Sequence, residues 1–255
     1  MIDIHNHILP GIDDGCKTLE ESMMALKQAS ELGVEAIIFT PHYVKGSKFN
    51  CNNKDKKKLL DLAKKEAKKN NINIDLYLGN EVYFENDMLS LVLDKEATTL
   101  NNTRYLLFEL PMTTEVNNLK EVIFSLRVKG VVPIIAHPER YTTFQEKPNA
   151  LIDLIEQGCL FQCNIGSLVG IYGKEANKCV RVLLKHNMVH FMASDTHHAN
   201  GKNYNLLLDA KKELVDLVGK EYANELLSVN AAKLLKDEDI NVREAKTVKK
   251  KIFFF

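Results

Sequence analysis

The chain opens with Met1-Ile2-Asp3-Ile4-His5-Asn6-His7, a short apolar run that ends in two histidines. Alternate side chains of a β-strand point to the same face, so the imidazoles of His5 and His7 are expected to point in one direction. Two imidazoles on one face can chelate a divalent metal ion, although a His-x-His pair alone is a weak signal. The opening run therefore predicts a buried first strand that carries two metal ligands at its end.

The same pattern, an apolar run that ends in a histidine or a carboxylate, returns further along the chain. The residues at these later ends are His42, Glu81, Glu109, His137, and the pair Asp195 and His197. One polar residue at the end of a strand means little, but repeated endings of this kind predict a polynuclear metal site at the mouth of a barrel. Asp14, in the loop after the first run, is expected to reach back over this mouth. We expect the last strand to lie beside the first, so that its two-apart pair faces the two opening histidines.

Strand-like runs alternate with helical runs along almost the whole chain. The runs expected as strands are 2–4, 34–42, 74–78, 105–108, 132–136, 160–164 and 190–193, and those expected as helices are 18–33, 54–70, 115–129, 149–157, 174–186 and 203–217, with two short helices after them. The first helix starts with Thr18-Leu19-Glu20-Glu21, a capping box. Seven strands separated by helices favour a parallel sheet or a closed barrel.

Composition bounds the fold and disfavours several functions. The chain has 255 residues, 45% of them hydrophobic, which suffices for one α/β domain at 1–245 with a basic and aromatic tail at 246–255. Lysine plus arginine equals aspartate plus glutamate at 34 each, which gives no support to nucleic-acid binding. No signal segment and no membrane insertion are expected. The five cysteines show no Cys-x-x-Cys spacing and are expected to be reduced thiols of a cytoplasmic protein.

The predicted ligands are imidazoles and carboxylates, without a thiolate. This donor set suits manganese, iron(II) or zinc better than copper or an iron–sulfur centre. His190 begins its strand with the opposite parity to Asp195 and is expected to be structural. Cysteine-dependent tyrosine phosphatases need an arginine six positions after the cysteine. The residues at those positions here are Ser22, Lys57, Ile165, Val169 and Lys185, so any cleavage of phosphotyrosine by this chain must depend on metal.

Six pieces of the chain form a recognisable set. They are Asp3-Ile4-His5-Asn6-His7-Ile8-Leu9-Pro10-Gly11-Ile12-Asp13-Asp14-Gly15, Thr40-Pro41-His42, Gly79-Asn80-Glu81, Phe108-Glu109, Ala136-His137-Pro138-Glu139-Arg140-Tyr141 and Ser194-Asp195-Thr196-His197. In this order they resemble the PHP (polymerase and histidinol phosphatase) superfamily, and within it the bacterial CpsB-type tyrosine-protein phosphatases of capsule and exopolysaccharide synthesis. The resemblance implies a distorted seven-stranded (β/α)7 TIM-like barrel of the PHP type with additional C-terminal helices.

The resemblance also implies how the site is built. It implies three metal ions, usually manganese, the first held by His5, His7, Glu81 and Asp195, the second by Glu81, Glu109 and His137, and the third by Asp14, His42 and His197. Arg140 matches the arginine that holds phosphate. Lys202 lies where a second phosphate contact is expected, although lysine lacks the bidentate geometry of arginine. A hydroxide activated by the metal ions would attack phosphorus directly, with Asp14 or His42 as candidate proton donors.

The substrate implied by the resemblance is a phosphotyrosine protein, the tyrosine-rich tail of a bacterial autokinase. A small-molecule phosphatase such as histidinol phosphatase would use the same chemistry. A metal-dependent nuclease is less favoured because a basic aromatic groove is missing, and a non-catalytic metal-binding protein would be expected to have lost ligands. Tyr43, Phe49, Tyr141 and Phe144 either stack on a substrate phenyl ring or pack as ordinary loop residues. The sequence leaves open the oligomeric state and whether the tail is frayed or docks elsewhere.

Overall fold

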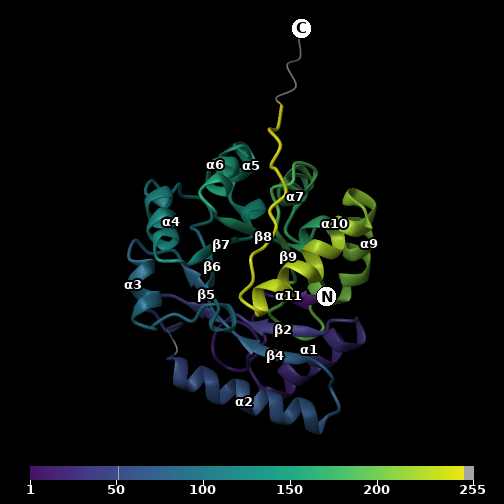
Figure 1. The fold of residues 1–255 in the computed structure, drawn as a ribbon. Helices are drawn as coiled ribbons and strands as arrows, with labels where there is room; N and C mark the ends of the chain where they lie inside the picture. The colour runs from purple at the N-terminus through teal and green to yellow at the C-terminus, as the bar shows by residue number, and fades with distance from the viewer. Residues whose placement is uncertain (51, 250–255) are drawn as a thin grey trace.

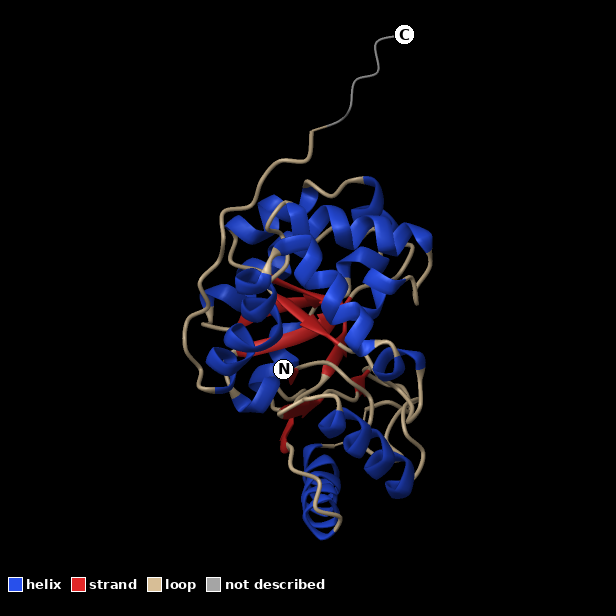
Figure 2. Ribbon diagram, turned by 90° about the vertical axis from the view of Figure 1, so that its right-hand side faces the viewer, coloured by secondary structure: helices blue, strands red, loops and turns tan. Residues whose placement is uncertain are grey.

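The computed structural model describes residues 1–50 and 52–249, and over these residues parallel strands form two sheets with helices packed around them (Figure 1, Figure 2). The strands are β1 (Ile2–Asp3), β2 (Ala36–Phe39), β3 (His42–Tyr43), β4 (Asp75–Leu78), β5 (Glu81–Tyr83), β6 (Tyr105–Glu109), β7 (Val132–Ala136), β8 (Leu160–Asn164) and β9 (Phe191–Ala193). The smaller sheet has the order β1-β2-β4 and the larger one the order β3-β5-β6-β7-β8-β9. Every ladder is parallel, as expected when helices connect the strands.

Most helices fall close to the ranges predicted from the sequence, but those at 88–93 and 142–146 were not predicted, and the helix predicted at 203–217 is divided in two. They are α1 (Leu19–Glu31), α2 (Asn53–Lys69), α3 (Met88–Leu93), α4 (Leu119–Val128), α5 (Thr142–Glu146), α6 (Ala150–Glu156), α7 (Lys174–Lys185), α8 (Lys202–Asn205), α9 (Leu207–Val218), α10 (Lys220–Asn224) and α11 (Asn230–Leu235), with short turns of other helix types at Leu100–Asn102, Pro138–Arg140, Ile165–Val169 and Glu225–Val229. Thr18 caps α1 by accepting the N–H of Glu21 at 3.2 Å. The Glu21 carboxylate accepts the N–H of Lys17 rather than that of Thr18, so only half of the predicted capping box forms.

The strand count differs from the seven that the sequence predicts: the described residues form nine. The run at 34–42 breaks at Thr40-Pro41 into β2 and β3, because proline has no N–H to donate to a ladder. A further strand, β5, follows the run at 74–78 after Gly79-Asn80. A side chain on Gly79 would approach Leu100 to 2.7 Å, so the chain passes this point without one. The two sheets confirm a parallel α/β fold, whereas a closed seven-stranded barrel stays a prediction.

The opening segment links the two sheets. Beyond the end of β1, the carbonyl of Asn6 accepts the N–H of Thr40, which follows β2, at 3.0 Å. On its other side, Asn6 forms a parallel bridge with Thr196, and the N–H of His7 donates to the Thr196 carbonyl at 2.8 Å. The segment after β1 therefore lies beside the segment after β9, which confirms the predicted neighbourhood of the first and last strands.

The predicted geometry of the last ligand pair is wrong. β9 ends at Ala193, so Asp195 and His197 lie beyond the strand rather than on it. Asp195 has a left-handed backbone with φ of 52°, which ends strand alternation at this point. A turn, and not the two-residue period of a strand, therefore directs these two side chains.

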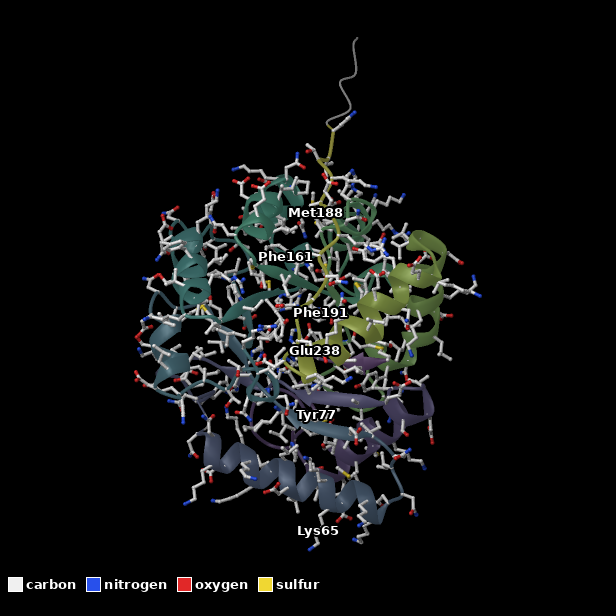
Figure 3. The ribbon with its side chains drawn as sticks, viewed as in Figure 1. Lys65, Tyr77, Phe161, Met188, Phe191 and Glu238 are labelled. Atoms are coloured by element: carbon white, nitrogen blue, oxygen red, sulfur yellow. The ribbon has the colours of Figure 1, made fainter. Side chains whose placement is uncertain are left out.

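Alternate residues of the strands pack on opposite faces. One cluster of buried side chains lies among the strands and contains Ile4, Ile38, Leu107, Ile134, Leu160 and Phe191. The neighbouring residues pack with the helices in a larger cluster that contains Ile37, Phe108, Ile135, Phe161 and Met192. In Figure 3 the labelled Phe161, Met188 and Phe191 lie inside the molecule, whereas Lys65 points outward from α2. Burial on both faces explains why the strands are nearly continuous apolar runs.

The first residues of the predicted tail are held against the body. The N–H of Lys246 donates to the His186 carbonyl at 2.9 Å, and the N–H of Val248 donates to the side chain of Asn149 at 2.8 Å. The rest of the tail, 250–255, lies outside the described residues, and the division at 245 stays a prediction. Over the residues that the structure describes, no helix is long and apolar enough to cross a membrane.

The buried His190 predicts an acid-sensitive stability. Its Nδ1 accepts the N–H of Phe161 at 3.0 Å, which requires an unprotonated nitrogen, and burial lowers the pKa of His190 from 6.5 to about 3. Between these values the unfolded chain binds one more proton than the folded chain. The free energy of unfolding should therefore fall as the pH falls through this window, by up to about 1.4 kcal/mol per pH unit from this residue.

The His190→Asn variant tests this prediction, because the asparagine side-chain oxygen can accept the same N–H. We expect the variant to be less stable than the wild type at neutral pH but to lose stability less steeply toward acid. Urea unfolding of both metal-free proteins at several pH values in this window measures the two slopes. Equal slopes would show that His190 does not stay neutral in the folded chain.

Candidate metal centre

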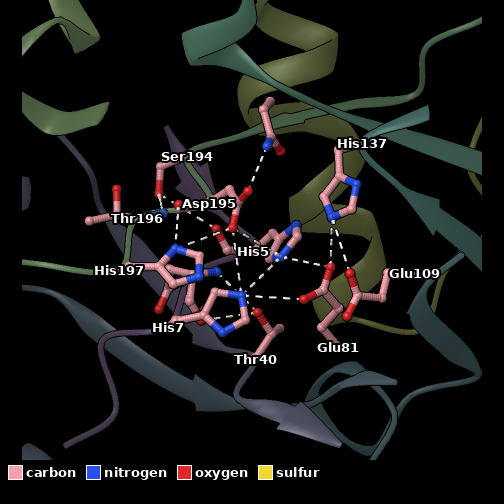
Figure 4. Close-up of polar contacts among 12 residues, drawn as sticks. His5, His7, Thr40, Glu81, Glu109, His137, Ser194, Asp195, Thr196 and His197 are labelled. Atoms are coloured by element: carbon pink, nitrogen blue, oxygen red, sulfur yellow. Dashed lines mark hydrogen bonds and ion pairs between the residues drawn. The ribbon is translucent and has the colours of Figure 1, made fainter. Parts of the chain in front are cut away.

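The structure brings all nine predicted ligands into one cluster at the carboxyl edge of the strands. Figure 4 labels His5, His7, Glu81, Glu109, His137, Asp195 and His197 of this cluster. Their ligand atoms form four groups, and within each group the atoms lie within 4.8 Å of one another. The groups are His7, Asp14, His42 and His197; His5, His7 and Glu81; His5, His137 and Asp195; and His42, Glu81 and Glu109. These groups overlap, so neighbouring ions would share ligands, as predicted, although the groups do not repeat the predicted ligand sets.

Glu81 lies at the middle of the cluster and is almost completely buried. Its two carboxylate oxygens face four imidazoles. The distances are 3.2 Å to His5 Nε2, 3.4 Å to His7 Nε2, 3.0 Å to His42 Nδ1 and 3.0 Å to His137 Nε2. Glu81 is the first residue of β5, directly opposite His42 of β3 in the parallel register. The start of β5 therefore sets the position of the central carboxylate.

A buried lysine stabilises the two breaks in the strands, at Pro41 and Asn80, that directly precede His42 and Glu81. Lys56 of α2 is fully buried and donates from Nζ to the side-chain oxygen of Asn80. The Asn80 amide in turn donates to the carbonyl of Pro41 at 2.8 Å. Asn80 directly precedes Glu81, and Pro41 directly precedes His42. The contacts between α2 and the two breaks thus fix where both ligand-bearing strands begin.

Two of the ligands have a backbone conformation that is rare for residues with a side chain. His137 has φ of 34° and Asp195 has φ of 52°, both in the left-handed region. Such strained positions persist where the surrounding contacts hold them and are common at functional sites. At Asp195 the carboxylate accepts hydrogen bonds from Arg140 at 3.0 Å and from the Asn164 amide at 2.6 Å. These contacts aim the carboxylate into the cluster.

Asp14 belongs to the group with His7, His42 and His197, and its side chain is the most exposed of the nine proposed ligands. Its carboxylate lies 3.5 Å from Nε2 of His42 and 3.8 Å from Nε2 of His197. The side chain of Asp14 is 53% exposed, compared with 1% for Glu81. A ligand at this edge faces solvent and an incoming substrate.

Residues that the sequence reasoning missed orient the histidines. His5 Nδ1 lies 2.6 Å from the side-chain oxygen of Gln162, and His7 Nδ1 lies 2.8 Å from Oδ2 of Asp13. Each contact leaves Nε2 of the same ring facing the cluster, which is the usual role of a partner behind a metal ligand. Gln162 and Asn164 alternate along the otherwise apolar β8, and this two-apart polar pair was a usable signal.

The charges in the cluster fit divalent metal ions. Burial alone would raise the pKa of Glu81, but the imidazoles around it, His5 and His42 foremost, outweigh burial and hold this pKa well below its ordinary value. Burial and the nearby Glu81 raise the pKa of Glu109 to about 8. Burial lowers the pKa of His5, yet Glu81 and Asp195 outweigh it and raise the value to about 9. The buried carboxylates are thus stabilised by nearby positive charge. Bound metal ions can supply this charge in place of the protons on the imidazoles.

The two predicted phosphate contacts lie at one pocket beside the cluster. This pocket has a volume of about 310 Å³ and is lined by Arg140, Tyr172, Asp195, His197 and Lys202, among others. The guanidinium of Arg140 lies 4.7 Å from the centre of the Tyr172 ring and also pairs with Asp195. Arg140 and Lys202 therefore provide cationic groups next to the proposed ligands, which is where a phosphate group would need them.

Three of the four candidate stacking aromatics are buried. Tyr43 donates from its hydroxyl to Glu96 at 2.9 Å and is 5% exposed. Tyr141 and Phe144 are also buried, and they pack against each other with ring centres 6.0 Å apart. Phe49 is partly exposed, with its ring centre 6.0 Å from that of His42. Among these four, Phe49 alone keeps both exposure and proximity to a proposed ligand.

Residues 1–236 match the family described as capsular polysaccharide synthesis, CpsB/CapC. The chain belongs to the CpsB/CapC family. This result confirms the family resemblance inferred from the motifs, and the match covers every proposed ligand of the metal centre.

Relatives of this CpsB/CapC-family protein align over nearly its whole length. Tyrosine-protein phosphatase YwqE of Bacillus subtilis (strain 168) is 32% identical over 257 residues, which cover 100% of this chain and 99% of YwqE. Tyrosine-protein phosphatase CpsB of Streptococcus agalactiae serotype III (strain NEM316) is 34% identical over 245 residues, which cover 94% of this chain and 100% of that protein.

A solved structure shares the fold. The matched chain comes from the crystal structures of YwqE from Bacillus subtilis and CpsB from Streptococcus pneumoniae, described as unique metal-dependent tyrosine phosphatases. It superposes on this chain with a TM-score of 0.89 at 31% identity. The match covers 98% of this chain and 100% of the other. This likeness confirms that the parallel sheets and helices of this chain form a known α/β fold.

Proposed function

We propose that this CpsB/CapC-family protein is a metal-dependent tyrosine-protein phosphatase. One observation carries the proposal: nine imidazole and carboxylate ligands converge beside a pocket that holds Arg140 and Lys202. Transfer of a phosphoryl group needs both of these features, because metal ions and cationic side chains together stabilise the negative charge on the phosphoryl oxygens. The relatives named tyrosine-protein phosphatase point to phosphotyrosine as the ester that is cleaved.

We propose three ions, with manganese as the metal and iron or zinc as alternatives. The supporting observation is the chain of overlapping donor groups, in which Glu81 and three histidines each belong to more than one group. When bound, divalent ions would supply Lewis acidity toward phosphoryl oxygens and lower the pKa of a coordinated water. The assignment of each ligand to one ion, and the seven-stranded closed barrel that the family implies, stay predictions.

The side chains divide the remaining work between them. Arg140 is positioned to bind the non-bridging oxygens of the phosphate, since its planar fork matches them in two-pronged geometry. Lys202, at the start of α8, adds a second positive charge to the same pocket. Asp14 and His42, which are also proposed ligands, lie at the solvent-facing edge and are the candidates to pass a proton to the departing tyrosyl oxygen. A tyrosyl group, with an ordinary pKa near 10, needs less protonation than a serine alkoxide.

We infer that the substrate is a phosphotyrosine protein of a capsule or exopolysaccharide pathway, and that it is the tail of a bacterial tyrosine autokinase. The family description, capsular polysaccharide synthesis, supports the pathway. The open edge of the site, with Asp14 half exposed, supports a macromolecular substrate over a small enclosed one. The autokinase and the cytoplasmic location stay predictions.

Hydrolysis of a phosphotyrosyl peptide with manganese present tests the function. We expect turnover that falls more than about 100-fold when a chelator removes the metal and that returns when manganese is added back. Treatment with a thiol-alkylating reagent should leave turnover unchanged, because the proposed ligands include no thiolate and none of the five cysteines has an arginine six positions after it.

Three parallel substrates separate this function from its alternatives. Phosphoseryl peptide, histidinol phosphate and DNA are assayed under the same conditions as the phosphotyrosyl peptide. Preferred hydrolysis of histidinol phosphate would favour the small-molecule phosphatase, and cleavage of DNA would favour the nuclease. Activity that survives chelation but is lost on alkylation would contradict the metal-dependent mechanism.

A further inference from the structure

A second cavity lies on the Glu109 side of the metal centre. It has a volume of about 220 Å³ and is formed by the loop between β6 and α4 with the first residues of α4, by α5 and by α6. Its walls include Leu110, Pro111, Val116, Tyr141, Phe144 and Leu154. The cavity shares none of its lining residues with the pocket of Arg140 and Lys202. It is therefore a separate place on the molecule.

This cavity lies at the same edge of the sheet as the proposed ligands. Its walls come from the segments that follow β6 and β7, and the carboxyl ends of parallel strands meet at one edge. Leu110 directly follows Glu109, and its N–H donates to the hydroxyl of Tyr141 at 2.9 Å. The Tyr141 ring lies 5.4 Å from the His137 ring, centre to centre. One tyrosine ring therefore forms the wall between the metal centre and the cavity.

The buried wall of the cavity is apolar, and exposed polar residues, Thr114, Glu115, Asn117 and Lys120, form its rim. Leu110, Tyr141, Phe144 and Leu154 are each at most 5% exposed, so they form a fixed wall rather than a mobile surface. Among the residues that line the cavity, the charged groups are Glu115 and Lys120, and Lys120 is already paired with Asp153 at 2.6 Å. A space of this size and character suits one large aliphatic or aromatic side chain.

We propose that this cavity, the Tyr141 pocket, is a subsite for a large apolar side chain of the protein substrate near its phosphotyrosine. The proposal rests on the proposed phosphatase function and names what its substrate must carry beyond the phosphorylated residue. An extended chain advances about 3.3 Å per residue, and one tyrosine ring separates the pocket from His137. A side chain about two to four residues from the phosphotyrosine would therefore reach the pocket while the phosphate lies at the metals.

The first test needs only the wild-type protein. Manganese-loaded enzyme is assayed with phosphotyrosyl peptides in which leucine or serine occupies one position at a time on either side of the phosphotyrosine. We expect one position, about two to four residues away, at which leucine raises kcat/KM about tenfold or more over serine, as a hydrophobic pocket discriminates. The absence of any such position would overturn the proposal.

The second test blocks the pocket from the start of α6. In the Ala150→Phe variant, a phenyl ring replaces a methyl group that lines the cavity. We expect the leucine preference to disappear, with kcat/KM for the leucine peptide falling about tenfold relative to kcat/KM for para-nitrophenyl phosphate, which has no flanking residues. The Glu156→Phe variant adds the same ring at an exposed position of the same helix and should retain the preference.

The outcomes separate the subsite from the function on which it rests. A leucine preference that persists in Ala150→Phe would overturn the subsite while leaving the phosphatase function intact. If the wild type fails to hydrolyse para-nitrophenyl phosphate and every peptide with manganese present, the proposed function itself fails. Should Ala150→Phe not fold, the peptide comparison on the wild type can still overturn the proposal.

Discussion

The Glu81→Gln variant is expected to lose more than about 100-fold of kcat/KM for a phosphotyrosyl peptide, together with part of its bound metal. The carboxylate is buried and faces four imidazoles at 3.0 to 3.4 Å. An amide keeps the shape but removes the charge, and it turns one of the two acceptors into a donor. Loss of a group that merely orients a metal ligand typically costs about 10- to 100-fold. Loss of a carboxylate that belongs to two donor groups should cost more.

Metal analysis and steady-state kinetics with excess manganese measure this effect. Excess manganese separates weaker binding, which added metal restores, from a lost catalytic geometry, which it does not restore. The Glu85→Gln variant is the matched control, since it makes the same chemical change four residues along the chain, outside the four donor groups. Full metal content together with a wild-type rate in Glu81→Gln would exclude Glu81 as a shared ligand.

The Arg140→Met variant is expected to lose about 10²- to 10³-fold of kcat/KM when it is assayed with manganese in excess. This range is the usual cost of removing one preorganised donor from a site where charge develops. Methionine keeps a flexible apolar stem but removes the guanidinium that lines the pocket beside Asp195. The kcat/KM of Arg140→Lys should lie between those of the wild type and of Arg140→Met, because lysine keeps the charge and loses the two-pronged contact.

Inorganic phosphate, as a competitive inhibitor, gives a second measure of this prediction. If Arg140 holds the phosphate group, the inhibition constant for phosphate should rise in Arg140→Met and rise less in Arg140→Lys. Arg127→Met is the control, because Arg127 is exposed on α4 and belongs neither to the metal-ligand groups nor to the lining of the Arg140 pocket. Unchanged phosphate inhibition in Arg140→Met would place the phosphate elsewhere in the site.

Much of the fold was predictable because its strands are short apolar runs that polar segments separate. The helices α1, α2, α4, α6 and α7 lie within a few residues of the predicted ranges. The strand breaks were harder to predict. A proline or glycine inside an apolar run marks a break only if other segments form hydrogen bonds to the chain at that point. At Pro41 that bonding comes from Asn80 and, through it, from Lys56 on a distant helix.

The candidate site was predictable as a set of residues but not as an arrangement. The His5 and His7 pair follows from strand alternation, whereas the direction of Asp195 depends on a left-handed turn that the two-residue period does not describe. Gln162 was missed because its role is to orient His5, a contact between residues 157 apart in the chain. The Tyr141 pocket likewise joins three segments that no local pattern connects.

The sequence by itself determined the chemistry of this protein: which imidazoles, carboxylates and cations stand at the ends of its apolar runs, and therefore which family it belongs to. Local patterns carry this information because burial and strand geometry act over a few residues. Only the tertiary structure decided which ligands share a group, that Arg140 pairs with Asp195, and that an apolar pocket lies behind Tyr141. These features depend on hydrogen bonds and packing between distant segments, and the period of a single strand or helix does not encode them.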